Sequence, residues 1–193
     1  MKVWILIFVC MFSMPLLVAV LHFRMRKGQI LKIRQDYVKN ARYFGQSFSS
    51  LVEKALPEMK NGMIMLSRQE KVLETDGKQE FVQPEIEDLV IARNTIFCPQ
   101  QEDLHFQKEI YSEKDALFVK ENIRLRAVYS KKRIVFGNKI RLLRWADAEH
   151  AVAVYDECDL GERISSGEQL VIGFDNIFRS LYAPVIRLGQ RPE

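Results

Sequence analysis

The stretch from Glu109 to Arg187 repeats a short pattern of alternating apolar and polar residues. Four segments align, beginning at Ala116, Arg133, Ala151 and Gln169, and the positions before their turns recur at a nearly constant spacing: Val119, Phe136, Val154 and Ile172. A unit this short with period-two alternation cannot bury its apolar face alone, so it must stack on its neighbours. The repeat predicts a mainly β fold, a short β-solenoid with about 18 residues per coil.

One coil shows the expected geometry. Gly137-Asn138 is expected to adopt positive φ and turn the chain. Phe136, Ile140 and Leu142 then point into the coil, and Arg141 points outward. The equivalent positions are Val119, Ile123 and Leu125 with Arg124 outside, Val154, Cys158 and Leu160 with Asp159 outside, and Ile172 followed by Asn176 or Ile177 where the register slips.

Val3 to Phe23 is an apolar run without charge, long enough as a helix to span a hydrocarbon core of about 30 Å. A cleaved secretory signal is the alternative, but the run lacks a small-residue cleavage site and basic residues follow it directly. We expect residues 1–27 to form an uncleaved transmembrane anchor. The basic topology cluster is Arg24, Arg26, Lys27, Lys32 and Arg34, and the positive-inside rule places the following domain in the cytoplasm.

Residues 28–60 are expected to form an amphipathic juxtamembrane helix that Pro57 ends. Its apolar residues recur at three- and four-residue steps: Ile30, Ile33, Tyr37, Ala41, Phe44, Phe48, Leu51 and Ala55. This apolar face fits a short coiled coil, packing on the following domain, or contact with anionic lipid.

Residues 61–105 are expected to form a linker and an N-terminal cap with short strands, because an uncovered solenoid end exposes unpaired strand edges. The solenoid domain follows at 106–189, and 190–193 form a tail. From Asn61 onward, nineteen basic residues face twenty-two acidic ones, which argues against a nucleic-acid partner. The odd number and wide spacing of Cys10, Cys98 and Cys158 indicate unpaired thiols in a reducing compartment, with Cys158 in the core.

Three phrases within 106–189 resemble the bactofilins, which are polymer-forming cytoskeletal proteins: Glu109-Ile-Tyr-Ser112, Arg144-Trp-Ala-Asp-Ala148 and Arg179-Ser-Leu-Tyr-Ala-Pro-Val185. The resemblance implies a right-handed β-helix that is cytoplasmic, bacterial, often membrane-associated and polymerises end to end without nucleotide. The chain departs from the family pattern because a full apolar span, a helix and an ordered region precede a short solenoid. These departures bear on whether filaments form.

The alternative function is a hexapeptide-repeat acyltransferase, for which His105 and His150 are the histidines outside the apolar run. Both are more simply surface or cap residues. The acidic residues Asp147, Glu149, Asp156, Glu157 and Asp159 fall on turns and outward positions, as solvated charges do. Phosphate-binding glycine loops, nucleophile elbows and metal-ligand spacings are missing from the sequence. We therefore expect no enzymatic activity, cofactor or metal.

The last coil carries the candidate self-association face: Phe174, Phe178, Leu181, Tyr182 and Val185. Together with Ile177 and Ile186 of the same apolar cluster, these residues form either an inward-packed C-terminal cap or an apolar face for another subunit. Trp145 is expected in the core, with a corner or an interface as alternatives. The predicted function is a single-pass scaffold at the bacterial inner membrane that binds itself, with a non-polymerising adaptor for a protein partner as a further alternative.

Overall fold

The structure, a computed structural model, describes residues 4, 11–18, 20–21 and 40–192. The chain divides into two compact units, Met1–Gln35 and Asp36–Glu193. Within the predicted transmembrane run Val3–Phe23, the structure describes residues 4, 11–18 and 20–21, all of them helical, and the rest of the run lies outside the described residues. The helices among the described residues are all too short or too polar to cross a membrane. The cluster Arg24, Arg26, Lys27, Lys32 and Arg34 also lies outside them.

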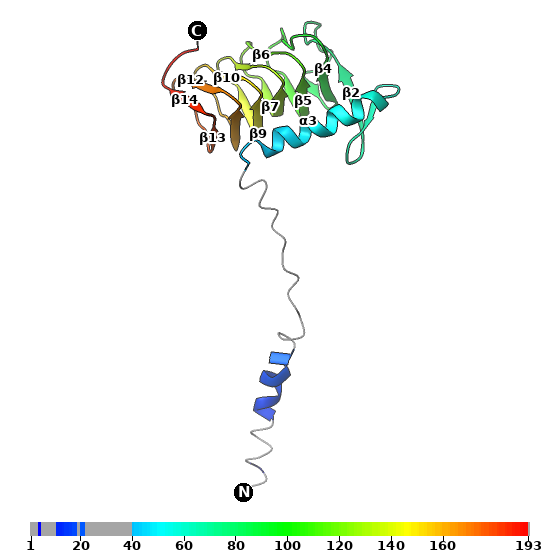
Figure 1. The fold of residues 1–193 in the computed structure, drawn as a ribbon, viewed down its shortest axis with the longest axis vertical. Coiled ribbons are helices and arrows are strands. Elements are labelled where there is room, and N and C mark those ends of the chain that lie inside the picture. The colour runs from blue at the N-terminus through cyan, green and yellow to red at the C-terminus, as the bar shows by residue number, and fades with distance from the viewer. Residues whose placement is uncertain (1–3, 5–10, 19, 22–39, 193) are drawn as a thin grey trace. The chain divides into compact units, whose positions relative to one another are not determined.

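The second unit is a β-solenoid of about six turns, so the predicted mainly β solenoid is confirmed (Figure 1). One sheet contains, in spatial order, β1 (Met63–Met65), β2 (Gln69–Glu74), β4 (Leu89–Ala92), β5 (His105–Ser112), β7 (Arg124–Ser130), β9 (Arg141–Ala148), β11 (Arg163–Ser166) and β13 (Leu181–Tyr182), with β3 (Glu85–Ile86) beside β5. The other contains β14 (Val185–Leu188), β12 (Gln169–Ile172), β10 (Ala151–Val154), β8 (Ile134–Phe136) and β6 (Ala116–Phe118). Every strand pair is parallel except β1 with β2.

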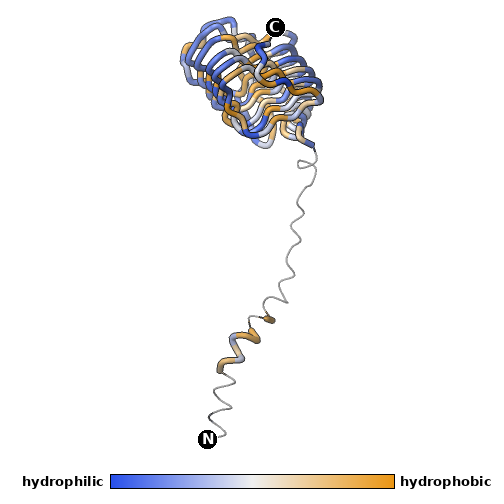
Figure 2. The backbone as a smooth tube through the Cα atoms, turned by 90° about the vertical axis from the view of Figure 1, so that its left-hand side faces the viewer, coloured by the Kyte–Doolittle hydropathy of each residue, from blue (hydrophilic) through white to orange (hydrophobic). Residues whose placement is uncertain are grey.

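The long strands of the first sheet are bent. The register shifts between Phe106 and Glu109 where β5 pairs with β7, and between Leu125 and Ala127 where β7 pairs with β9. Each long strand therefore contributes two short ladders, and the second sheet contributes a third. The coils stack as successive loops along the solenoid (Figure 2).

The predicted alignment is wrong by one position in its first coil. Phe118 pairs in register with Phe136 and is fully buried, whereas Val119 is 50 % exposed. The corner after Phe118 is one position longer than the corner after Phe136, because the residues with positive φ that follow are Asn122 and Lys139. Val119 occupies the longer corner, and the inward positions after it, such as Ile123, are as predicted.

The predicted turn conformation at Gly137-Asn138 is also wrong, because the left-handed residue at this corner is Lys139, with φ of 58°. Glycine is needed at position 137 for a different reason. A Cβ there would lie 2.9 Å from the carbonyl oxygen of Phe118 in the coil before. The glycine therefore permits close stacking of backbones rather than a positive φ.

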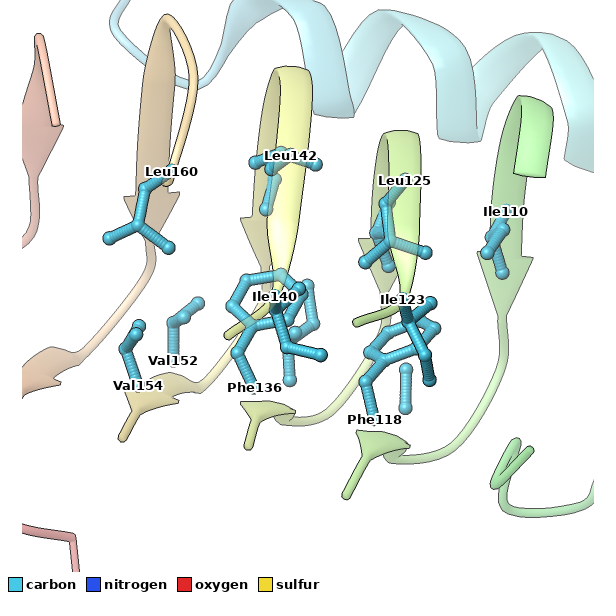
Figure 3. Close-up of a cluster of buried hydrophobic side chains, with 14 of the residues drawn as sticks. Ile110, Phe118, Ile123, Leu125, Phe136, Ile140, Leu142, Val152, Val154 and Leu160 are labelled. Carbon is cyan, nitrogen blue, oxygen red and sulfur yellow. The ribbon is translucent and has the colours of Figure 1, made fainter. Parts of the chain in front are cut away.

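The interior consists of columns of apolar side chains that run from coil to coil (Figure 3). Ile123, Ile140 and Cys158 occupy one such position and are at most 1 % exposed, as predicted. The rings of Phe118 and Phe136 stack with centroids 5.6 Å apart. Full burial of side chains of this size contributes roughly 1.5–3 kcal/mol each, so the columns are the main source of stability.

The segment predicted as a separate cap, 61–105, belongs largely to the solenoid. β2 pairs in parallel with β4, and β4 pairs in parallel with β5, so the ladder begins at β2. The true cover is the loop between β2 and β3, in which Phe81 packs against Phe106 with ring centroids 5.7 Å apart.

The amphipathic helix is confirmed over α3 (Tyr43–Ala55), which the short 3-10 turn η1 (Leu56–Glu58) ends at Pro57. Residues 40–42, which the prediction also placed in the helix, form a turn before it. It packs on the outside of the first sheet, and Val52 is fully buried there. Phe48 meets the rings of Tyr111 and Trp145 at 6.4 and 5.7 Å. Packing on the following domain is therefore the setting observed for this helix (Figure 1). Trp145 is buried, but between sheet and helix rather than inside the coil.

Candidate functional site

The C-terminal end of the solenoid exposes the ends of its apolar core columns. Leu160, Ile164, Leu170 and Ile172 are at most 1 % exposed. The residues one coil later on the same columns are Phe178, Leu181, Ile186 and Leu188, which we call the end face. Phe178, Ile186 and Leu188 are 39, 41 and 55 % exposed, and Leu181 is half-buried. Their side chains occupy inward positions, and within residues 40–192 no further coil covers them.

The structure divides the five predicted face residues. Phe178 and Leu181 lie on inward columns and belong to the end face. Tyr182 and Val185 pair in register with Ser165 and Gln169, so they occupy outward positions on the flank. Phe174, which is 50 % exposed, lies in the turn before the last coil. The inward-packed cap does not form, because all but Leu181 of the five are at least 39 % exposed.

Ile186 belonged to the predicted apolar cluster but not to the five face residues, and Leu188 was not predicted at all. They pair with Leu170 and Ile172, and the coil that separates each pair is shorter than the coil between β10 and β12 or between β8 and β10. An alignment with a fixed repeat length therefore does not place these two residues on the inward columns. Alternation of apolar residues in Val185-Ile-Arg-Leu188 was the signal that could have identified them.

The turn before the last coil and the tail after that coil are both held to the corner after β10 by polar contacts. The backbone N–H of Phe174 donates to Asp156 Oδ1 at 2.9 Å, and Arg191 Nε donates to Asp156 Oδ2 at 3.0 Å. The Phe174 bond and Arg191 lower the pKa of the Asp156 carboxyl. Asn176 accepts from the N–H of Cys158 and donates to the carbonyl oxygen of Tyr155. The end face is thus presented by an ordered coil.

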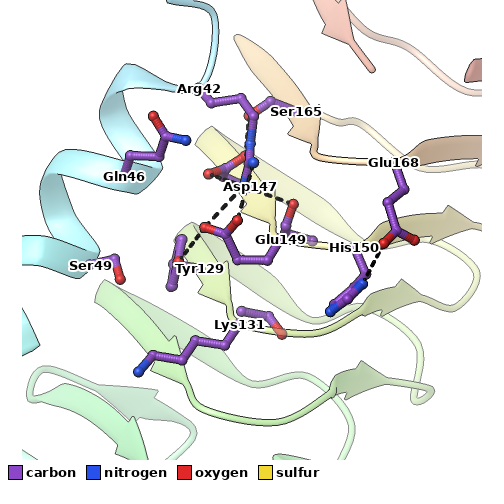
Figure 4. A network of polar contacts seen from close by, with 12 residues as sticks. Arg42, Gln46, Ser49, Tyr129, Lys131, Asp147, Glu149, His150, Ser165 and Glu168 are labelled. Atoms are coloured by element: carbon purple, nitrogen blue, oxygen red, sulfur yellow. Dashed lines mark hydrogen bonds and ion pairs between the residues drawn. The ribbon is translucent and has the colours of Figure 1, made fainter. Parts of the chain in front are cut away.

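A buried polar network holds α3 to the solenoid on its flank (Figure 4). Arg42 Nε donates to Asp147 Oδ1 at 2.8 Å, and its Nη1 donates to Glu149 Oε2 at 3.2 Å. Ser165 donates to Asp147 at 2.7 Å, and Tyr129 donates to Glu149 at 2.7 Å. The prediction that these acidic residues are solvated is wrong for Asp147, whose side chain is 1 % exposed, because α3 covers it.

Burial and ion pairing shift the pKa values of the residues in this network in opposite directions. Burial raises the pKa of Asp147 despite the hydrogen bonds from Arg42 and Ser165. Burial alone would lower the pKa of Arg42, but its bonds to the two carboxylates outweigh that effect and raise it. Burial would also raise the pKa of Glu149, but the bonds from Tyr129 and Arg42 lower it. These contacts are structural, since they join helix to sheet.

The two histidines considered for catalysis each lie near a single carboxylate. His150 Nδ1 is 2.6 Å from Glu168 Oε1 on the surface, and His105 Nδ1 is 3.9 Å from Glu85. His105, Arg124, Arg126 and Arg141 line an open surface hollow of about 440 Å³ at the bend of the long strands. Among the residues that the structure describes, His, Cys, Asp and Glu nowhere gather in a group of three that could hold a metal ion.

Two of the three cysteines, Cys98 and Cys158, lie in the part of the chain that the structure describes. Cys98 is half-buried and Cys158 is buried, and both are free thiols. Burial raises the pKa of Cys158 to about 11. Its thiol is therefore protonated at neutral pH and acts as a core residue.

Comparisons of the chain with protein-family models, with curated proteins and with solved structures find no match. The similarity to bactofilins in 106–189 therefore stays a resemblance of sequence pattern.

Proposed function

We propose that this protein is a bactofilin-like structural scaffold that self-associates through its β-solenoid at the cytoplasmic face of a bacterial inner membrane. The observation that carries the proposal is the end face, where four core columns finish in uncovered apolar side chains. Exposed contiguous apolar surface of this kind marks interaction sites in soluble domains. The second support is backbone, because β13 and β14 are edge strands with every second hydrogen-bonding group facing away from the ladder.

The mechanism is geometric. Stacked coils form a rigid body, and contact at the end buries the apolar columns of one solenoid against another subunit. The apolar run Val3–Phe23 would hold the assembly at the membrane as a single-pass anchor, and the basic cluster after it would orient the solenoid toward the cytoplasm. In this proposal the coil follows the right-handed path that the resemblance implies.

The test measures the mass of the full-length protein in mild detergent by light scattering. The wild-type chain is expected to exceed the monomer mass of 22.6 kDa. Phe178→Arg is expected to return it to a monomer, because a buried charge without a partner is unfavourable at an apolar contact. Leu143→Arg is the matched control, since Leu143 is 67 % exposed on the flank. Loss of association in both variants, or in neither, would contradict the assignment of the end face.

The membrane part of the proposal has its own test. Removing residues 1–27 is expected to move the protein from the membrane fraction to the soluble fraction of the cells, while Phe178→Arg leaves the full chain in the membrane fraction. A truncated protein that stays in the membrane fraction would show that the apolar run is not the anchor.

A further inference from the structure

We propose that self-association closes at two copies, which meet end face to end face about a two-fold axis. This inference rests on the proposed function, because it specifies how the same surface pairs. A rod that grows head to tail needs both ends to be available, whereas a two-fold contact uses the same surface on each copy and then stops. In this solenoid the N-terminal end is covered and the C-terminal end is open, as a two-fold contact through one surface requires.

The core columns at the N-terminal end are covered. Val90, Phe97 and Leu104 are fully buried, in contrast to Phe178 and Leu188 at the other end. The covering segment is the loop Thr75–Gln83. Its Asp76 carbonyl oxygen accepts from the N–H of Cys98 at 2.8 Å, and its Gly77 approaches so closely that a Cβ would lie 3.1 Å from the Phe97 ring. Phe81 of the same loop packs on the core.

The strand edge at the N-terminal end is covered as well. β2 pairs with the antiparallel strand β1, so the parallel ladder cannot continue past β2. Ile64 of β1 is 2 % exposed and packs against the second core under α3. β1 is only three residues long, and charged Lys60 and Arg68 lie near its two ends. Short edge strands with charged neighbours resist pairing with another chain.

The C-terminal end fits a second copy of itself. The four end-face residues are all apolar, and Arg187 of β14 pairs in register with the outward residue Val171. Asn176, the one polar residue on an inward column of this coil, has its amide oxygen and nitrogen hydrogen-bonded to Cys158 and Tyr155. Two end faces can therefore meet without burying an unpaired charge. A two-fold axis also sets β14 antiparallel to β14 of the other copy, so that each edge satisfies the other's free N–H and C=O groups. In the described part of the tail, the N–H of Gln190 donates to the carbonyl oxygen of Ile172 and Arg191 binds Asp156 two coils back, so these two residues lie along the flank and not over the end face.

The test uses full-length Leu188→Cys in mild detergent, with native mass measured before oxidation. Leu188 belongs to the end face, and a two-fold contact uses the same surface on both copies, so one substitution is expected to give a disulfide-linked dimer of about 45 kDa, twice the monomer mass of 22.6 kDa. Val82→Cys is the control, because Val82 is fully exposed on the covering loop at the other end. The wild-type chain, with its own three cysteines, is oxidised in parallel.

Linked dimers for Leu188→Cys alone, with a native mass that stops at two copies, support the inference. A native mass that rises beyond two copies with concentration overturns the closed dimer and leaves self-association through the end face standing. The double variant Val82→Cys/Leu188→Cys is oxidised as well. Disulfide links that form in this double variant but in neither single variant show head-to-tail contact and also overturn the inference. A monomer at every concentration overturns the inference and the proposed function together.

Discussion

Arg42 joins two parts of the molecule that are far apart in sequence. Its guanidinium group binds Asp147 through two nitrogens and also reaches Glu149 and the carbonyl oxygen of Ala148. Such planar bidentate contacts are specific to arginine. Because the Asp147 side chain is almost fully removed from water, loss of the arginine would leave a buried charge. The contact therefore fixes the start of α3 on β9.

Replacing Arg42 by Met is expected to lower the free energy of unfolding by about 3–5 kcal/mol at pH 7, the usual cost of breaking a buried ion pair. The double variant Arg42→Met/Asp147→Leu is expected to recover most of this loss, because no charge is left buried. Urea unfolding followed by Trp145 fluorescence in a Trp4→Phe background measures both. A double variant no more stable than the single one would contradict the account.

The loss in Arg42→Met is expected to grow with pH. The pKa of Asp147 is raised by burial and rises further without Arg42, so the carboxyl destabilises the fold as pH increases through its folded pKa. The pKa of Glu149 is lowered partly by Arg42, and the stability it supplies is present above its unfolded pKa. The variant loses this contribution too. Unfolding at pH 4 and pH 7 tests the sign, and a loss that shrinks with pH would disprove it.

Gly45 allows α3 to approach the sheet at the same place. A Cβ on Gly45 would lie 2.3 Å from Cβ and Oδ2 of Asp147. Alanine favours helix over glycine by about 1 kcal/mol, but overpacking costs about 1–3 kcal/mol. Gly45→Ala is therefore expected to destabilise the protein, and Ser50→Ala, on the exposed side of α3, is the control. A more stable Gly45→Ala protein would show that α3 can move away freely.

At the scale of elements, one face of α3 forms a second core on the outside of the coil. Val52 and Leu51 are neighbours in sequence, yet Val52 is fully buried and Leu51 is 49 % exposed. Val52→Ala is expected to cost about 2 kcal/mol, and Leu51→Ala less than about 0.5 kcal/mol, although leucine is the larger residue. Equal effects in urea unfolding would mean that α3 is not docked in solution.

The stacking register makes a parallel prediction for the coils. Phe136→Ala is expected to cost about 3–5 kcal/mol in urea unfolding, because Phe136 fills a closed core column. Val119→Ala is expected to be nearly neutral, since Val119 lies at an exposed corner rather than on the column. A large loss of stability in Val119→Ala would contradict the register in which Phe118, and not Val119, pairs with Phe136.

The solenoid and most of its interior could be predicted from sequence, because alternation fixes which side chains face inward once coils stack. Ile123, Ile140 and Cys158 follow from that rule alone. The extra corner residue near Val119 could not be predicted, since a longer corner in one coil is offset by a shorter connection elsewhere in that coil. The total length of the coil therefore does not reveal where the extra residue lies. The docking of α3 depends on partners such as Arg42 and Asp147, and long-range polar pairs leave no periodic signal.

At the scale of the whole molecule, the main feature is that the N-terminal end of the solenoid core is covered while the C-terminal end is exposed. The sequence predicted a self-association face in the last coil and a separate cap in 61–105 at the N-terminal end. The structure reduces that cover to the loop Thr75–Gln83 and the pairing of β1 with β2. At the other end it adds Ile186 and Leu188 to the exposed columns. The columns that these two residues continue follow from the register of the last, shorter coil.

The most direct measurement of the central claim is hydrogen exchange of the β13 and β14 amides at low and high protein concentration. If the end face associates, the edge amides of these strands are expected to exchange more slowly at high concentration, and Phe178→Arg should remove the difference. The amides of β1, at the covered end, serve as the internal control. Exchange of β14 that is independent of concentration would contradict assembly through this end.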